Sequence, residues 1–222
     1  MARITSGEVE YLVTLLQLEE SGRPMTAANV SRELSVSAPT VHEMVRRLEA
    51  DGLIERDERK RIAFTEEGGR VAREAASRHR VVERFLTDVL GIPWHRVHSE
   101  AERIERSISD EVAERMRAAI GTATTCPHGH PIDAGARVRC ATRLDEVEPG
   151  TRVTVLRFED EHDDTLRPIH DAGLRRGVAA TVTARDEDAV VLATDGGEAR
   201  VDAQLAGTVT VWSTPTAADV AP

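Results

Sequence analysis

The sequence predicts a mainly α-helical protein of three parts that ends in a small β-barrel. Three observations predict this fold class. Short helical patterns separated by turn signals fill the first third, longer helical patterns fill the middle, and short alternating apolar runs follow. Aromatic residues make up only 3% of the 222 residues, so the core must be aliphatic. We expect domains at residues 1–74, 75–140 and 141–222, with residues 123–140 as a linker.

The N-terminal domain shows the order helix, helix, turn, helix, hairpin. Ser37 is a candidate N-cap with Pro39 in the first turn of the helix that follows, and Gly52 ends that helix. Residues 53–57 and 61–64 predict the two strands of a basic hairpin. This order is typical of a winged helix-turn-helix, in which the last helix enters the major groove of DNA.

The helix after Ser37 carries the side chains that we expect to face DNA. Small residues at its start would let it approach base edges closely, and basic residues on it and in the hairpin would neutralise phosphates. A structural helical hairpin with a solvated arginine face is the alternative. Glu43 would repel phosphates unless it accepts a hydrogen bond from a cytosine amino group. The expected DNA-binding residues are Ser37, Pro39, Thr40, Glu43, Arg46, Arg47, Arg59, Lys60 and Arg61.

The middle part carries histidines and carboxylates at helical spacing. His79 and Glu83 are four residues apart, so they share one helix face, and His98, Glu102 and Glu105 form a stripe on the next helix. Such a set can hold a divalent first-row metal. Surface ion pairs along the helices are the alternative.

The C-terminal part, residues 141–213, alternates apolar and polar residues in about five short runs, which predicts a small barrel. Most of the acidity behind the net charge of −10 lies there, so the first two thirds can still carry a local basic face. No run of ~20 apolar residues predicts a membrane span. No secretory signal is visible and two cysteines are too few for a disulfide framework, so we expect a cytoplasmic protein.

Several segments together resemble one family. These are RHRVVERFLTDVLGI followed by VHSEAERIERSISDEV, the SAPTV start of the third helix and the CPHGHPI linker. They are similar to the DtxR/IdeR/MntR family of metal-dependent transcriptional regulators, over about residues 5–210. The resemblance implies a winged helix-turn-helix, a helical metal-binding and dimerisation domain, and an SH3-like (FeoA-like) barrel.

The resemblance also implies two metal sites. One joins the N-terminal helix to the dimerisation domain, and Glu10, Glu102 and Glu105 match its ligand positions. Arg106 stands where a histidine is usual, and our hypothesis is that its guanidinium partly replaces a metal there. The second site is matched by His79, Glu83 and His98, completed from the barrel by Glu161 and His162 as first choices.

The expected function is that of a homodimeric regulator that binds double-stranded operator DNA and represses metal-homeostasis genes. Mn²⁺ is the first choice of effector and Fe²⁺ the next, because the first site offers hard oxygen ligands. A family member that has lost metal control, through Arg106, is the alternative. A metallohydrolase would need a motif such as HExxH, which the chain lacks, so we expect no enzyme. A zinc site in the linker would use Cys126, His128, His130 and Cys140.

Overall fold

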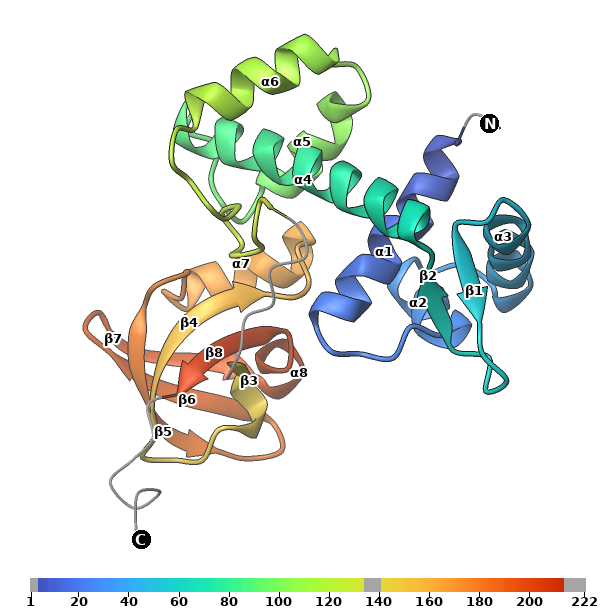
Figure 1. Cartoon of the computed structure of the whole chain (residues 1–222). Helices are drawn as coiled ribbons and strands as arrows, with labels where there is room; N and C mark the ends of the chain where they lie inside the picture. Colours follow the sequence, from blue (N-terminus) through green and yellow to red (C-terminus); the bar gives the residue numbers. More distant parts are fainter. Residues whose placement is uncertain (1–3, 134–140, 214–222) are drawn as a thin grey trace, which may run out of the picture. The chain divides into compact units, whose positions relative to one another are not determined.

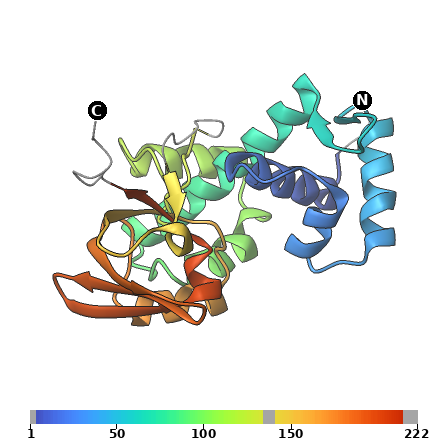
Figure 2. The ribbon, with the colours of Figure 1, turned by 90° about the horizontal axis from the view of Figure 1, so that it is seen from below.

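The computed structural model describes residues 4–133 and 141–213, which fall into two compact units. Residues 4–78 form the first unit, and residues 79–132 and 141–213 form the second. In Figures 1 and 2 the chain can be followed by colour, from the blue winged helix through the green helices to the orange and red sheet. The predicted mainly helical fold with a small β part is confirmed.

The first unit is a winged helix-turn-helix built from α1 (Ser6–Glu20), α2 (Ala27–Glu33), α3 (Ala38–Ala50), β1 (Ile54–Arg56) and β2 (Ile62–Phe64). Ser37 caps α3 as predicted, since its hydroxyl accepts from the amide of Thr40. Gly52 ends α3 with a φ of 69°, a conformation that glycine adopts without a steric penalty. The strands β1 and β2 pair antiparallel. Leucine, isoleucine and valine side chains of all three helices and both strands form one core.

A single long helix, α4 (Glu66–Asp88), crosses the boundary expected between residues 74 and 75. Gly68 and Gly69 lie inside this helix. A Cβ atom at Gly68 would lie 1.8 Å from the carbonyl oxygen of Leu53. Gly68 therefore lets α4 pack closely on the backbone of Leu53, which lies between α3 and β1. This close packing outweighs the low helix propensity of glycine.

The second unit begins with the C-terminal half of α4, followed by α5 (Val97–Glu105) and α6 (Asp110–Ala119). Val82, Leu86, Val97 and Ala101 form a small apolar cluster between α4 and α5. This packing fixes the two helices against each other, so the polar side chains of their shared face lie at defined positions.

The stretch expected to be a linker is packed in its first half. Cys126, His128, His130 and Ile132 are all buried, and the amide of Cys126 donates to the carbonyl of His130 in a tight turn. Proline and glycine are as typical of a compact turn as of a linker, and burial depends on contacts far away in the sequence. Residues 134–140, including Cys140, lie outside the described residues.

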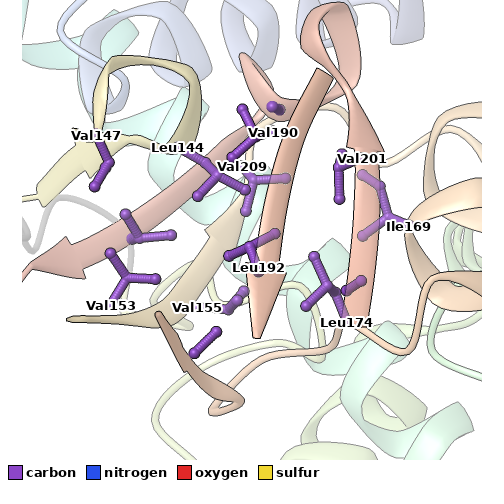
Figure 3. Close-up of a cluster of buried hydrophobic side chains, with 14 of the residues drawn as sticks. Leu144, Val147, Val153, Val155, Ile169, Leu174, Val190, Leu192, Val201 and Val209 are labelled. Atoms are coloured by element: carbon purple, nitrogen blue, oxygen red, sulfur yellow. The ribbon is translucent and has the colours of Figure 1, made fainter. Parts of the chain in front are cut away.

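The C-terminal part is a six-stranded antiparallel sheet in the order β3-β8-β4-β5-β6-β7. Its strands are β3 (Ala141–Arg143), β4 (Arg152–Phe158), β5 (Ala179–Arg185), β6 (Ala189–Thr194), β7 (Gly197–Asp202) and β8 (Val209–Ser213). The five predicted strands are present, and β3 is an additional short one. The sequence analysis also missed α7 (Asp163–Asp171), α8 (Ala203–Ala206) and the 3₁₀ turn η1 (Leu144–Glu146). Figure 3 shows the aliphatic core that the strands share with Ile169 of α7.

Candidate metal centre

Four side chains from three separate segments meet inside the second unit. His79 and Glu83 come from α4, His98 from α5, and Glu161 from the loop between β4 and α7. His79 Nε2 lies 3.0 Å from Glu83 Oε1 and 3.1 Å from His98 Nδ1. His98 Nδ1 lies 3.0 Å from Glu83 Oε1 and 3.2 Å from Glu161 Oε2. The structure thus brings together the predicted His79, Glu83 and His98 with the predicted barrel residue Glu161.

A second set of potential ligands shares both carboxylates. His128 Nδ1 lies 3.3 Å from Glu83 Oε1 and 3.3 Å from Glu161 Oε1. The thiol of Cys126 lies 3.9 Å from Glu161 Oε1. Glu83, Cys126, His128 and Glu161 are all buried and close enough to hold one ion. Sequence reasoning had placed the cysteine and this histidine in a separate linker site, although their CPH spacing already marked them as possible ligands.

The backbone around Gly129 places this second set. Gly129 has a φ of 101°, and a Cβ atom there would lie 2.2 Å from the carbonyl oxygen of Leu156 in β4. The carbonyl of His128 accepts from the amide of Phe158, at the end of the same strand. Only a glycine allows this close approach of the turn to the strand. The turn and Glu161 are therefore held side by side by main-chain contacts.

The hydrogen bonds on the far sides of the imidazoles indicate which nitrogens face the cluster with a lone pair. His128 Nε2 donates to the carbonyl of Trp94 at 2.8 Å, so Nδ1 is the nitrogen that would offer a lone pair once its proton is displaced. His79 Nδ1 donates to Glu105 Oε2 at 2.7 Å, so Nε2 is the corresponding nitrogen of His79. Among the described residues, His128 Nδ1 and Glu83 Oε2 are buried without a hydrogen-bond partner. Such outer partners on imidazoles are typical of metal-ligating histidines.

Acceptors that face one another in a buried cluster need a proton or a cation between them. The separations of 3.0–3.3 Å also match adjacent ligands around one ion with bonds of about 2.1 Å. The donor set of carboxylates, imidazoles and one thiol suits a divalent transition metal. The residues present therefore fit a metal ion.

In the metal-free protein, protons take the place of the cation. Burial alone would lower the pKa of His79, but Glu83 and Glu105 outweigh burial and raise it to about 10. Burial likewise opposes protonation of His98, but Glu102, Glu161 and Glu83 raise its pKa to about 12. Burial would raise the pKa of Glu83, but His128 and His79 hold it well below its usual range. A metal ion must therefore displace protons from the imidazoles.

The other predicted metal ligands lie elsewhere. The carboxylate of Glu105 accepts from His79, so it supports the cluster from outside. Glu102 is 58% exposed, with Oε1 3.6 Å from His98 Nε2. Glu10 is exposed on α1 of the first unit, and Arg106 is exposed at the end of α5. The structure describes no ion pair of Arg106 within residues 4–133 and 141–213.

The placement of His162 differs from the prediction. Its side chain is 76% exposed and lies 2.9 Å from Asp160, outside both sets of potential ligands. The residue stands at the N-cap position of α7, where the backbone turns the side chain away from the buried Glu161. Glu161 therefore lies within the buried cluster and His162 lies outside it, and the metal-ligand role of each stays a prediction.

The expected DNA-facing side chains are all exposed on the first unit. They lie on α3 and its cap, and on the tip of the hairpin between β1 and β2. Lys60 has a φ of 59°, and the amide of Arg61 donates to Asp57 in the hairpin turn. Arg47 is held by an ion pair with Glu8, 2.7 Å between Nε and Oε1. The sequence analysis did not anticipate this partner.

Three family models match the chain in succession. The model described as "Iron dependent repressor, N-terminal DNA binding domain" matches residues 4–62. The model described as "Iron dependent repressor, metal binding and dimerisation domain" matches residues 65–134, and the FeoA domain matches residues 142–212.

Known proteins and structures are similar along most of the chain. The iron-dependent repressor IdeR of Mycobacterium tuberculosis is 34% identical over 203 residues, which cover 85% of this chain and 88% of that protein. The diphtheria toxin repressor of Corynebacterium diphtheriae is 30% identical over 215 residues, covering 90% and 94%. The structure of a manganese-dependent transcriptional repressor in complex with manganese has a TM-score of 0.82 at 29% identity, covering 93% of this chain and 100% of that chain. The crystal structure of T. acidophilum IdeR has a TM-score of 0.76 at 26% identity, covering 96% of this chain and 100% of that chain.

None of the helices that the structure describes is long and apolar enough to cross a membrane.

Proposed function

The chain belongs to the DtxR/IdeR/MntR family of metal-dependent transcriptional regulators, and from this premise we propose that it is a metal-responsive repressor. It binds operator DNA as a homodimer through two winged helices, and a divalent metal ion raises its affinity for DNA. The observation that carries the metal response is the buried cluster in which nitrogens of His79, His98 and His128 lie 3.0–3.3 Å from carboxylate oxygens of Glu83 and Glu161.

The residues of the cluster have distinct roles in this proposal. His79, His98 and His128 supply neutral nitrogen ligands, and Glu83 and Glu161 supply the negative charge that a divalent ion balances. Glu105 and the carbonyl of Trp94 orient His79 and His128 from outside the cluster. When bound, the ion would supply a positive charge held by ligands from α4, α5, the turn before Ile132 and the loop after β4. An ion that binds the DNA-competent state more tightly raises operator affinity by that difference.

Mn²⁺ and Fe²⁺ both suit this cluster. The preference for Mn²⁺ rested on the all-oxygen set of Glu10, Glu102 and Glu105, and that set stays a prediction. The cluster described above contains imidazoles and the thiol of Cys126, which are softer donors that suit Fe²⁺ as well. The names of the relatives refer to both iron and manganese.

The test measures metal content and DNA affinity together. The probe is a duplex enriched from a random-sequence pool by the protein loaded with Mn²⁺, and binding is followed by fluorescence anisotropy with Mn²⁺, with Fe²⁺ under anaerobic conditions, and with a chelator. We expect tight binding only with metal. His98→Ala should abolish most of the metal response, whereas His162→Ala, which removes an exposed histidine outside the cluster, should leave it intact.

Two outcomes would contradict the proposal. Equal DNA affinity with metal and with chelator would favour the alternative of a family member without metal control, for which Arg106 is the sequence argument. Equal loss of metal in the His98→Ala and His162→Ala variants would show that the metal response does not come from this cluster.

A further inference from the structure

A buried carboxylate lies behind the helix that faces DNA. Glu8, in the first turn of α1, is only 2% exposed. Its Oε2 accepts from the amide of Thr5 at 2.6 Å and from the Thr5 hydroxyl at 2.7 Å. Its Oε1 lies 2.7 Å from Nε of Arg47, in the last turn of α3. Both oxygens of this carboxylate are therefore engaged, as a buried charge requires.

Arg47 is bound to Glu8 through its Nε, while the rest of its side chain is largely exposed to solvent. Its side chain is 54% exposed although its Nε contacts a buried group. A guanidinium carries five N–H donors in a planar fork, so pairing at Nε leaves donors at the outer nitrogens for a phosphate. Arg46, the neighbouring exposed arginine, has no ion pair within the part of the chain that the structure describes. The two arginines therefore differ in how far they are fixed before DNA binds.

The first turn of α1 also contacts α3 at a second point. A Cβ atom at Gly7 would lie 3.8 Å from the terminal methyl of Met44, so the backbone of α1 lies close to the side chain of Met44 there. The ion pair and this contact join the start of α1 to the middle and end of α3. Removal of the carboxylate would free the arginine without removing the packing.

We propose that Glu8 is a positioning residue for DNA binding, which holds the guanidinium of Arg47 in place to clamp a phosphate of the DNA backbone. This inference rests on the proposed function and deepens it. An arginine that is already fixed loses less rotamer freedom when it binds a phosphate, so more of the interaction energy appears as affinity. The negative charge of Glu8 does not reach the DNA unopposed, because it is buried and paired.

The direction in which Glu8→Gln changes DNA affinity distinguishes a positioning role from a purely electrostatic one. Glu8→Gln keeps the size and an acceptor oxygen for Thr5 but removes a negative charge near the DNA-binding face. Charge alone predicts tighter binding to DNA. Positioning predicts weaker binding, by roughly three- to tenfold, because the arginine must then be ordered when DNA binds.

The experiment is a mutant cycle on operator binding by the full-length, Mn²⁺-loaded protein, with the duplex enriched by the wild-type protein as probe. We expect Glu8→Gln to weaken binding in the wild-type and Arg46→Ala backgrounds, and to have no further effect in the Arg47→Ala background. Arg47→Ala itself should lower the slope of binding against salt by about one. Glu33→Gln removes a more exposed carboxylate that pairs with Arg23 at 2.6 Å, and should leave affinity unchanged.

Two results would overturn the inference. Tighter binding by Glu8→Gln would show that only its charge matters. An equal loss in the Arg47→Ala background would show that Glu8 acts on the fold and not through Arg47. Absence of metal-dependent DNA binding by the wild-type protein would instead overturn the proposed function, and the inference with it.

Discussion

Cys126 belongs to only one of the two sets of potential ligands, the set with Glu83, His128 and Glu161, and it supplies the only thiol in either set. Burial raises its pKa to about 11, so it is protonated in the metal-free protein at neutral pH. A metal ion that binds the second set must displace this proton, because the thiolate is the ligand.

We predict that Cys126→Ser weakens metal binding and removes the thiolate-to-metal charge-transfer absorption of the Co²⁺-loaded protein. The reason is that serine replaces the only sulfur among the described ligands. Absorption spectra and metal titrations of the two proteins measure the change, with Cys140→Ser as the control. An unchanged spectrum in the Cys126→Ser variant would place the ion in the set of His79, Glu83, His98 and Glu161 alone.

His79 makes the stability of the metal-free protein depend on pH. Its pKa is about 10 in the folded protein against the ordinary histidine value of 6.5, so the folded state holds the proton more tightly. The stabilisation is fully present below pH 6.5 and is lost as the pH rises through about 10. We predict that the free energy of unfolding, measured with urea in the presence of a chelator, falls over this window.

The control for this pH dependence is His42, an exposed histidine of α3. His79→Gln should reduce the slope of the decline between pH 6.5 and 10 and leave the part that His98 causes, whereas His42→Gln should leave the slope as in the wild type. A decline that is equally steep in the His79→Gln variant would show that other groups cause it.

At the scale of elements, the features that could be predicted from the sequence are those that depend on residues close together in the chain. The caps and glycines of α3 and the i, i+4 spacing of His79 and Glu83 are local signals, and the structure bears them out in geometry. The turn that carries Cys126 and His128 is different. Its composition is that of a loop, and only packing against β4, about 30 residues later, makes it part of the cluster. The outward turn of His162 likewise depends on where α7 begins.

This turn is the element on which the next prediction depends. We predict that Gly129→Ala destabilises the protein more than Gly150→Ala. Both glycines have positive φ, 101° and 89°, so both substitutions strain the backbone, by about 1–3 kcal/mol. Only Gly129 has a carbonyl oxygen 2.2 Å from the added Cβ atom, while nothing lies within 4 Å of that atom at Gly150.

Thermal unfolding and metal titration of the two variants measure this difference. Gly129→Ala should also weaken metal binding, because displacement of the turn moves His128 away from Glu83 and Glu161. Gly150→Ala should retain the metal affinity of the wild type. Similar melting temperatures and metal affinities in the two variants would mean that the turn does not position the ligands.

At the scale of the whole molecule, one ion would connect distant segments of the second unit. The potential ligands come from α4, α5, the turn around Gly129 and the loop after β4, which span residues 79 to 161. None of them belongs to the first unit. A ligand that binds only the folded state stabilises it by about 2.7 kcal/mol at a hundred times its dissociation constant.

We therefore predict that Mn²⁺ slows amide hydrogen exchange in a pattern that follows the ligands. Exchange should slow in the C-terminal half of α4, in α5, in residues 124–132 and in the loop that contains Glu161, because local opening of any of these segments would break a bond to the ion. The hairpin tip at Arg59–Arg61 holds no ligand, so its exchange should change far less. His98→Ala should abolish the protection and His162→Ala should retain it. Protection that is confined to α4 and α5, with none in residues 124–132 or around Glu161, would mean that the ion is held by the helices alone, and that the turn and the barrel contribute no ligand.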